Sequence, residues 1–170
     1  VVTVIKFSNA GQICVAPNRV FVADSVREIF TEKVVERASI AKVGFDKDSD
    51  IQTGPVIDGI AWNRLKGLIE SAVSDGAQLL FGGGRPNDLK SGYYIAPTVL
   101  TGVNETMEVY RQETFGPIIS IIPFNNEVRL LQMANDCEEG GLTAYIFTND
   151  LERAEYYASR LRYGEIQING

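Results

Sequence analysis

The segment 118–124 (Ile-Ile-Ser-Ile-Ile-Pro-Phe) is a nearly continuous apolar run, and it constrains the fold more than any other part of the chain. Apolar runs of this length suit a strand that is covered on both faces. The chain has 170 residues, 45% of them hydrophobic and 22% charged, which fits one globular domain with a real core. We therefore expect a buried sheet with helices against it.

Strand and helix patterns alternate along the rest of the chain. Further strands are predicted at residues 19–23, 77–81, 93–100, 142–148 and 164–169. Helices are predicted at residues 25–40, 58–75, 126–135 and from 149 onward. Alternation of this kind favours an α/β domain, so we predict a three-layer fold with a mostly parallel sheet flanked by helices.

Local signals predict some element ends. Ser25 and Glu28 fit a capping box, so the first predicted helix is expected to begin at Ser25. Gly76 is expected to end the second helix. Pro97 interrupts the strand predicted around it, which favours an edge position for that strand. The polar segment 44–54 is predicted to be a loop.

Charge and residue usage exclude several functions and sites. A net charge of −6 argues against general nucleic-acid binding. The sequence contains no run of about 18 apolar residues, so no membrane span is predicted. We recognise no secretory leader, and Cys14 and Cys137 are too far apart for a disulfide framework or zinc cluster, so a reducing, cytoplasmic setting is expected. The chain has no histidine, which excludes a Cys-His or Ser-His dyad within it, and no metal site is expected.

Cys14 is the candidate nucleophile and lies in the segment 7–19 (Phe-Ser-Asn-Ala-Gly-Gln-Ile-Cys-Val-Ala-Pro-Asn-Arg), called here the nucleophile segment. A cysteine thiolate can attack an electrophilic carbonyl carbon and form a covalent intermediate. Backbone amides around residues 11–15 are expected to stabilise the negative charge, and Gly11 would permit a close backbone approach. Taken alone, Cys14 is better explained as a small buried hydrophobic residue, and it is the flanking residues 9–12 and Arg19 that favour a nucleophile.

A second segment, 112–117 (Gln-Glu-Thr-Phe-Gly-Pro), makes this cysteine interpretable. Together, the two segments resemble the aldehyde dehydrogenase superfamily. Further matches follow in the family's order at Gly54-Pro55, Gly82–Gly84, Tyr93-Tyr94, Pro97-Thr98, Met107, Ala134-Asn135, Gly141-Leu142, residues 147–150, Gly164 and Asn169. Because the resemblance covers nearly the whole chain in order and spacing, it is highly specific.

The resemblance implies part of an NAD(P)-dependent aldehyde dehydrogenase that oxidises an aldehyde to a carboxylic acid. Cys14 would carry the thiohemiacetal and then the thioester, and its own N–H would form half of the oxyanion hole. Glu113 would bind the nicotinamide-side ribose of NAD or NADP, and Phe115 would pack near the nicotinamide ring. The alternatives are a solvated carboxylate at Glu113 and a plain core residue at Phe115.

The resemblance also implies substrate contacts. Ile13 and Val15 flank the nucleophile and would line the aldehyde pocket, while Asn169 would shape the substrate entrance. A terminal polar residue without a function is an equal alternative for Asn169. Cys137 matches no role in the family and is expected to be structural or exposed.

By resemblance, residues 1–170 form the nucleophile-bearing catalytic domain, with the cofactor-binding domain and the C-terminal segment absent. In the family, the cofactor domain supplies the phosphate-binding turn, a catalytic glutamate and an oxyanion-hole asparagine, so the isolated chain is expected to be inactive. A homo-oligomer, either dimer or tetramer, is expected. Residues 137–140 depart from the family by a one-residue insertion and the loss of an aromatic residue.

The substrate is expected to be a small aldehyde. The chain looks most like the branches that handle succinic semialdehyde and lactaldehyde. Three alternatives stay open at this point: a CoA-acylating semialdehyde dehydrogenase, a cofactor-independent thiol esterase, and a non-catalytic interaction domain.

Overall fold

The computed structural model describes residues 1–45, 50–137 and 141–170. Its main elements are α1 (Val2–Phe7), β1 (Arg19–Ala23), α2 (Arg27–Ile40), α3 (Gly59–Ser74), β2 (Gln78–Phe81), β3 (Thr98–Thr101), α4 (Glu108–Arg111), β4 (Ile118–Phe124), α5 (Glu127–Asn135), β5 (Gly141–Ile146), α6 (Leu151–Ala158) and β6 (Tyr163–Ile168). Short 3-10 turns at Ser8–Gly11 and Asp24–Val26 precede β1 and α2. The predicted alternation of strands and helices is confirmed.

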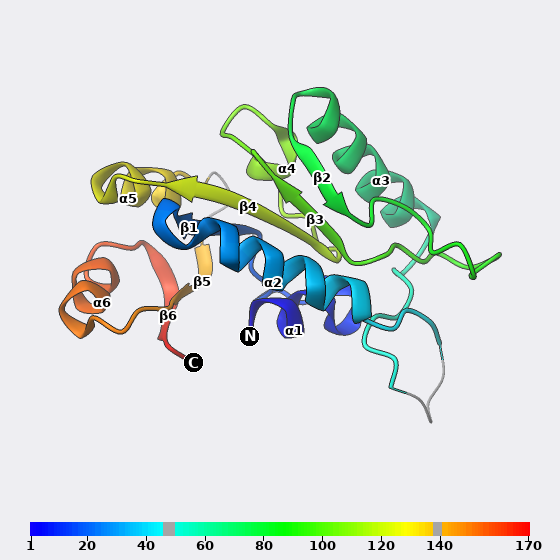
Figure 1. Cartoon of the computed structure of the whole chain (residues 1–170), viewed down its shortest axis with the longest axis horizontal. Coiled ribbons are helices and arrows are strands. Elements are labelled where there is room, and N and C mark those ends of the chain that lie inside the picture. Colours follow the sequence, from blue (N-terminus) through cyan, green and yellow to red (C-terminus); the bar gives the residue numbers. More distant parts are fainter. Residues whose placement is uncertain (46–49, 138–140) are drawn as a thin grey trace.

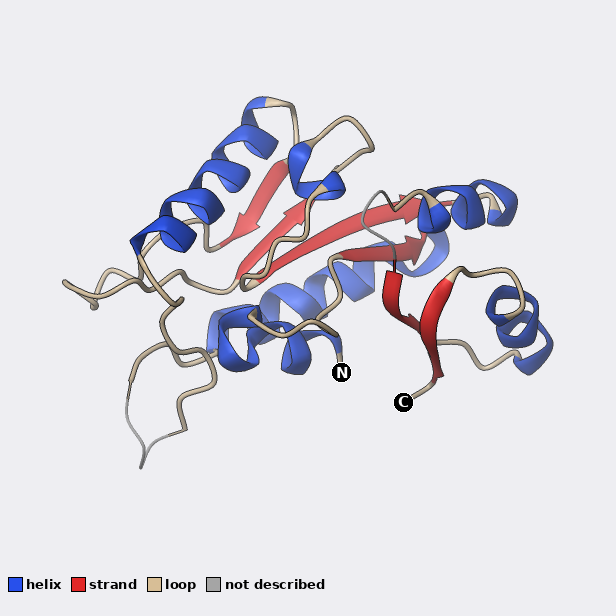
Figure 2. Cartoon of the chain, turned by 180° about the vertical axis from the view of Figure 1, so that it is seen from behind, coloured by secondary structure: helices blue, strands red, loops and turns tan. Residues whose placement is uncertain are grey.

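The strands form two sheets (Figures 1 and 2). In the larger sheet the order is β1-β4-β3-β2, with β4 parallel to both β1 and β3, and β2 antiparallel to β3. In the smaller sheet β5 and β6 pair in parallel. The prediction of an α/β fold with a mostly parallel sheet is therefore confirmed, and the structure adds that the sheet is divided in two.

Strand β4 is covered on both faces, as its apolar run predicts. Ile119 and Ile121 pack in one core with residues of α1 and α2, including Phe7 and Val34. Ile118 and Ile122 belong to a second core with residues of α3 and α4. These four isoleucines are at most 2% exposed. Burial of each such side chain contributes about 1.5–3 kcal/mol, so this strand holds the three layers together.

The smaller sheet has its own, smaller core. Leu131 of α5 packs there with Ile146 of β5 and with Ala154 and Tyr157 of α6. Helix α5 follows β4 directly and thus connects the two units (Figure 1). Each sheet therefore has its own hydrophobic core, and α5 links the two.

The predicted edge position for the strand after Pro97 is wrong. Strand β3 begins at Thr98 and lies between β4 and β2, so it is an interior strand. Pro97 precedes its first residue, and the ladder starts with Thr98, whose N–H donates to the Pro117 carbonyl oxygen at 2.8 Å. The proline therefore removes no hydrogen bond from the strand.

The predicted capping box at Ser25 is also wrong. Residues 24–26 form a 3-10 turn, and α2 begins at Arg27 with Val26 as its N-cap and no side-chain cap. By contrast, Gly76 adopts a φ of +103° just after α3, which confirms its predicted role as a helix stop. Of the predicted loop at 44–54 and the insertion at 137–140, residues 46–49 and 138–140 lie outside the described residues.

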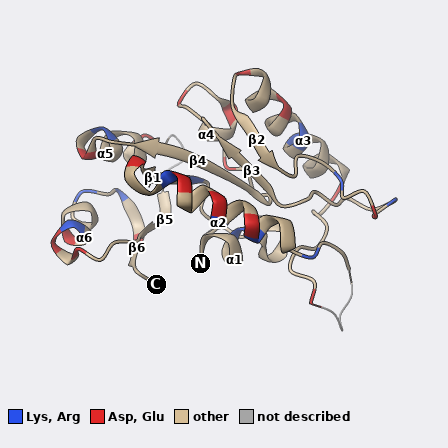
Figure 3. Ribbon diagram, in the orientation of Figure 1, with Lys and Arg blue, Asp and Glu red and all other residues tan. Residues whose placement is uncertain are grey.

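Charged side chains are distributed over the surface (Figure 3). Acidic residues follow one another at helical spacing along α2, where Glu28, Glu32 and Glu36 are all exposed. This solvated face contributes to the net charge of −6. Within the described residues, no helix is long and apolar enough to cross a membrane.

Candidate active site

Cys14 occupies an exposed turn that follows an unusual stretch of backbone. Asn9, Ala10 and Gly11 adopt successive left-handed conformations with φ of 50°, 54° and 70°. Such conformations cost about 1–2 kcal/mol for residues with a side chain, so the surrounding structure must impose them. The chain then forms a turn in which the Ala16 N–H donates to the Ile13 carbonyl oxygen at 2.9 Å.

The position of Cys14 in this turn suits a nucleophile. Its side chain is exposed, so the alternative of a small buried hydrophobic residue is wrong. Its backbone N–H donates to no acceptor within the described part of the chain. A free N–H beside the sulfur can donate to an oxyanion that forms on the attacked carbon. The turn thus offers both a nucleophile and one oxyanion donor.

The nucleophile segment touches the 112–117 segment backbone to backbone. A Cβ atom at Gly11 would lie 2.3 Å from the Gly116 carbonyl oxygen and 2.7 Å from the Lys6 carbonyl oxygen. A Cβ atom at Gly116 would lie 2.3 Å from a methyl carbon of Leu65 in α3. A side chain at Gly11 would therefore push the two segments apart, and a side chain at Gly116 would collide with the Leu65 side chain of α3.

Side chains from both flanks hold the 112–117 segment. The N–H and the hydroxyl of Thr114 both lie 2.8 Å from Oδ1 of Asn18, whose amide nitrogen donates to the Gln112 carbonyl oxygen at 2.6 Å. On the other side, the Arg64 guanidinium of α3 donates to the carbonyl oxygens of Glu113 at 3.2 Å and Thr114 at 2.5 Å. The two motifs of the sequence are thus one hydrogen-bonded unit.

This arrangement presents Glu113 and Phe115 to the outside. Glu113 is exposed, while Thr114 and Gly116 on either side of Phe115 are buried. Phe115 has a φ of 43°, a left-handed conformation, and its side chain is 40% exposed. Phe115 is therefore no core residue, and its ring is available for contact with a ligand.

A cavity of about 1140 Å³ lies beside Cys14, between the larger sheet and the β5–β6 unit. Its lining includes Cys14, Val15 and Glu113. Among the described residues, Ile13, Phe115 and Asn169 do not line it.

Asn169 makes a structural contact at the end of β6. It has a φ of 56°, its Oδ1 accepts from the Thr148 N–H at 3.0 Å, and its Nδ2 donates to the Thr148 carbonyl oxygen at 2.9 Å. This pair of hydrogen bonds joins the loops that follow β5 and β6. The substrate role of Asn169 stays a prediction.

Tyr145 is a site residue that the sequence analysis missed. Its hydroxyl donates to the Val15 carbonyl oxygen at 3.0 Å and so ties the nucleophile turn to β5. Burial raises the pKa of Tyr145, and the electrostatic effect of nearby Glu165 and Cys14 adds to this shift. A tyrosine within an apolar strand pattern carries no signal of such a contact, because the contact joins residues 130 positions apart.

Gln12 brings a further sequence motif to the site. Its Oε1 accepts from the Ile57 N–H at 2.9 Å, and its Nε2 donates to the Asn9 carbonyl oxygen at 3.0 Å and the Pro55 carbonyl oxygen at 3.4 Å. The Gly54-Pro55 pair therefore lies against the nucleophile segment.

Comparison with known proteins agrees with this geometry. The sequence model described as "Aldehyde dehydrogenase family" matches residues 1–170. The chain belongs to the aldehyde dehydrogenase family. It is 39% identical over 165 residues to "Succinate-semialdehyde dehydrogenase [NADP(+)] 2" of Schizosaccharomyces pombe, covering 97% of this chain and 33% of that protein. It is 36% identical over 163 residues to a chloroplastic betaine aldehyde dehydrogenase of Atriplex hortensis, covering 96% and 32%.

Solved structures of the family superpose on the chain. Succinate-semialdehyde dehydrogenase from Burkholderia pseudomallei matches with a TM-score of 0.92 and 38% identity, covering 98% of this chain and 34% of that one. An aldehyde dehydrogenase of Mycobacterium tuberculosis, complexed with NAD+, matches with a TM-score of 0.93 and 32% identity, covering 99% and 35%. The chain therefore spans about a third of the length of these relatives.

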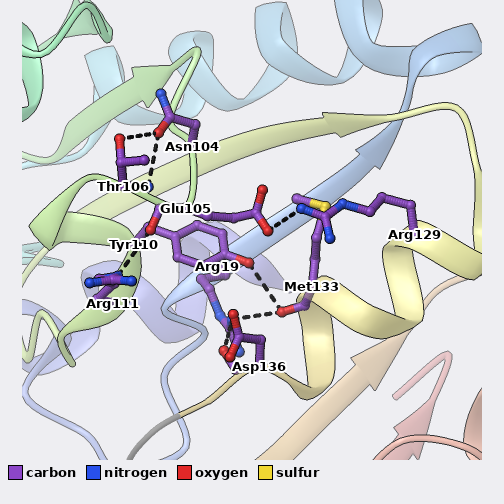
Figure 4. Close-up of polar contacts among 9 residues, drawn as sticks. All are labelled: Arg19, Asn104, Glu105, Thr106, Tyr110, Arg111, Arg129, Met133 and Asp136. Atoms are coloured by element: carbon purple, nitrogen blue, oxygen red, sulfur yellow. Dashed lines mark hydrogen bonds and ion pairs between the residues drawn. The ribbon is translucent and has the colours of Figure 1, made fainter.

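In this aldehyde dehydrogenase chain, Arg19 at the end of the nucleophile segment connects the two sheets. Figure 4 shows its contacts with Met133 and Asp136 at the end of α5. Its guanidinium donates to the carbonyl oxygens of Met133 and Asp136 at 2.9 Å and of Ala134 at 3.0 Å, which lie at the C-terminal end of α5. It also donates to the Tyr163 hydroxyl of β6 at 3.1 Å. A cation at a helix C-terminus satisfies free carbonyl groups and the helix dipole. The sequence motif contains Arg19 but does not reveal this role.

Cys137 lies near this network. It is half-buried and interacts electrostatically with Tyr163, whose pKa is raised by burial against the opposing effect of Arg19. Its partial burial fits the expected structural role.

Lys6 is the second residue that the sequence analysis missed. It lies in α1, is 1% exposed, and its Nζ donates to the Thr114 hydroxyl at 2.8 Å. Burial lowers the pKa of Lys6 from 10.5 to about 7, and the charge of Glu113 partly opposes this shift. A single lysine in a short apolar helix gives no indication in the sequence that it is buried.

Proposed function

We propose that the chain is the nucleophile-bearing part of an NAD(P)-dependent aldehyde dehydrogenase that oxidises an aldehyde to a carboxylic acid. The observation that carries the proposal is the exposed Cys14, with a free N–H of its own, in a turn locked to the segment of Glu113 and Phe115. The resemblance implies that the remaining catalytic groups would lie in the part of the relatives' length that the chain does not span, which is about two thirds of it.

The chemistry at Cys14 begins with attack of its thiolate on the carbonyl carbon of the aldehyde. The C–S bond forms while the carbonyl π electrons move to oxygen, and the Cys14 N–H donates to that oxyanion. When bound, NAD or NADP supplies the acceptor for the hydride that leaves the same carbon. The thioester left on Cys14 reacts with water, which releases the acid and restores the thiol. The turn stays in place through the hydrogen bond from Tyr145 to Val15.

Glu113 and Phe115 fit the cofactor role. The Glu113 carboxylate makes no hydrogen bond or ion pair within the described part of the chain, so its oxygens can accept from ribose hydroxyls. Phe115 presents a partly exposed ring from a backbone held on both sides. Hydrogen bonds hold the backbone of their segment in place, while the side chains of Glu113 and Phe115 are exposed. This arrangement suits the binding of a flat, hydroxyl-bearing ligand.

We propose a small aldehyde as the substrate, with succinic semialdehyde as the first candidate. Two relatives among those that match are named for succinate semialdehyde and are 39% and 38% identical to the chain. Val15 lines the cavity beside Cys14. The aldehyde contacts expected of Ile13 and Asn169 stay predictions, because neither residue lines this cavity. A cytoplasmic location and assembly into a dimer or tetramer belong to the same proposal, by analogy with the family.

The test is nicotinamide absorbance in the full-length protein that carries this chain, with NAD or NADP and a panel of short aldehydes. Cofactor reduction is expected, and Cys14→Ala should abolish it. Cys137→Ala is the matched control and should retain it, because Cys137 lies outside the proposed chemistry. The isolated chain should show no turnover. Turnover that survives Cys14→Ala would overturn the proposal.

A further inference from the structure

A charged side chain buried at the centre of the site is not used by the proposed chemistry. Lys6 is 1% exposed, and its neighbour in sequence, Phe7, belongs to an apolar core with Ile119 and Ile121. Within the described residues, the hydrogen bond of its Nζ is to the hydroxyl of Thr114, which is itself fully buried. The amine is therefore committed to one partner, in the middle of the 112–117 segment.

The hydrogen-bond directions in this cluster are fully determined by chemistry. Oδ1 of Asn18 can only accept, so the Thr114 hydroxyl must donate to it. That hydroxyl therefore uses a lone pair to accept from Lys6. A chain of donors runs from Lys6 through Thr114 to Asn18, and the Asn18 amide then donates to the Gln112 carbonyl oxygen. Lys6 is the first donor of a relay that ends on the segment's own backbone.

An apolar residue would serve the core better than this lysine. Burying an amine or ammonium costs free energy, and one hydrogen bond to a hydroxyl offsets only part of that cost. The pKa of about 7 expresses this penalty, since the buried amine loses its proton far more readily than a solvated lysine. What the lysine adds at this place is the directional bond to Thr114.

The bond acts where the two motifs meet. Thr114 lies between Glu113 and Phe115, and Asn18 lies four residues after Cys14. Arg64 holds the opposite flank of the segment through the Glu113 and Thr114 carbonyl oxygens. Loss of the relay would remove the side-chain hydrogen bonds on this flank, while Arg64 on the α3 side and the backbone contact between Gly11 and Gly116 would stay.

We propose that Lys6 is a positioning residue that, through Thr114 and Asn18, holds Glu113 and Phe115 in register with Cys14. The inference rests on the proposed function, because its consequence is the placement of the cofactor relative to the nucleophile. Lys6 touches neither the substrate nor the cofactor. It acts on the segment that carries the cofactor-binding side chains.

The test compares Lys6→Met with Lys33→Met, a matched change on the exposed face of α2, in the full-length protein. Loss of one hydrogen bond to a charged or polar donor corresponds to about tenfold in an equilibrium. We expect Lys6→Met to raise the KM for NAD or NADP about tenfold and to leave the KM for the aldehyde within about twofold. Hydrogen exchange at residues 112–117 should become faster by a similar factor, although the rest of the core stays protected.

Two variants of Thr114 keep the test informative if Lys6→Met fails to fold. Thr114→Val removes the hydroxyl and should raise the KM for NAD or NADP as Lys6→Met does. Thr114→Ser retains a hydroxyl, so its KM for NAD or NADP should stay within about twofold of that of the unmodified protein. Unchanged exchange at residues 112–117 in Lys6→Met, or faster exchange with an unchanged cofactor KM, would overturn the proposal. If the unmodified protein reduces no cofactor, the proposed function fails. If hydrogen exchange in Lys6→Met still becomes faster only in this segment, Lys6 is nevertheless confirmed as the group that holds the segment in place.

Discussion

The four-stranded sheet and the β5–β6 unit come from similar sequence patterns but are packed very differently. In the larger sheet, Val99, Leu100 and Ile119 are fully buried. In the smaller unit, Leu142 is 53% exposed and Ile168 is 40% exposed. Apolar runs therefore predict strands in both places, but they do not predict how completely each strand is covered.

The difference arises from the layers on either side. The larger sheet has α1 and α2 on one face and α3 and α4 on the other, so alternate side chains enter two separate cores. The smaller unit packs against α5 and α6, while part of it faces the cavity beside Cys14. Burial thus depends on a second covering layer, which the β5–β6 unit lacks on its cavity side.

The largest expected effect tests this contrast in burial. Ile119→Ala removes a fully buried side chain from β4 and should lower the free energy of unfolding by about 2–5 kcal/mol. Ile166→Ala, in the half-buried position of β6, should cost about half as much or less, because less apolar contact is lost. Urea denaturation of both variants measures the difference. Equal losses would mean that the two units are equally well packed.

The next effect tests the connection between the units. Arg19→Met leaves the carbonyl oxygens at the end of α5 without their donor, and the expected loss of stability is about 2–3 kcal/mol. Arg37→Met, at an exposed position on α2, is the control and should change stability by less than about 0.5 kcal/mol. Hydrogen exchange should show the loss mainly in α5 and β6. Protection unchanged in β6 would show that Arg19 does not connect the sheets.

A third prediction concerns the buried charge in the larger unit. The pKa of Lys6 is about 7 in the folded state and 10.5 as a free side chain, so between these values the unfolded state binds one more proton. The free energy of unfolding of the unmodified protein should therefore rise with pH relative to Lys6→Met, by about 1.4 kcal/mol per pH unit.

The difference in free energy of unfolding in favour of Lys6→Met over the unmodified protein should be greatest below pH 7. It should shrink as the pH rises from 7.5 to 8.5. Glu113, the charged group that acts on Lys6, is present in both proteins and does not alter this comparison. Denaturant titrations at the two pH values measure the gap. A gap independent of pH would show that Lys6 stays charged in the folded protein.

The smallest expected effect lies on the open face of the smaller unit. Leu142→Ser changes an exposed side chain and should alter the free energy of unfolding by less than about 0.5 kcal/mol. Leu100→Ser, at a fully buried position of β3, is its counterpart and should be strongly destabilising. Comparable losses at the two positions would mean that Leu142 is covered in the folded protein.

Much of the fold could be predicted from local pattern. The run at 118–124 predicts a strand covered on both faces, and Gly76 predicts the end of α3. The edge position after Pro97 and the capping box at Ser25 are wrong, because strand order and a local 3-10 turn decided them. A proline is compatible with an interior strand when the ladder begins after it.

For the candidate site, too, the local motifs could be predicted from the sequence and the long-range contacts could not. Both motifs, with Cys14, Glu113 and Phe115, are recognisable in the sequence, and the family comparison confirms the resemblance that they carry. The parts played by Tyr145 and Lys6 were not recognisable, because each acts through a hydrogen bond between residues more than 100 positions apart. Such contacts leave no periodicity or local motif.

By itself, the sequence determined the strand and helix pattern, the family and the candidate nucleophile, since these depend on hydrophobic spacing and on short runs of particular residues. The tertiary structure alone decided which side chains are buried, that Gly11 meets Gly116, and that Lys6, Thr114 and Asn18 form one relay. The physical reason is that burial and hydrogen-bond partners depend on which segments fold against one another, whereas propensity and motif depend on residues that are neighbours in the chain.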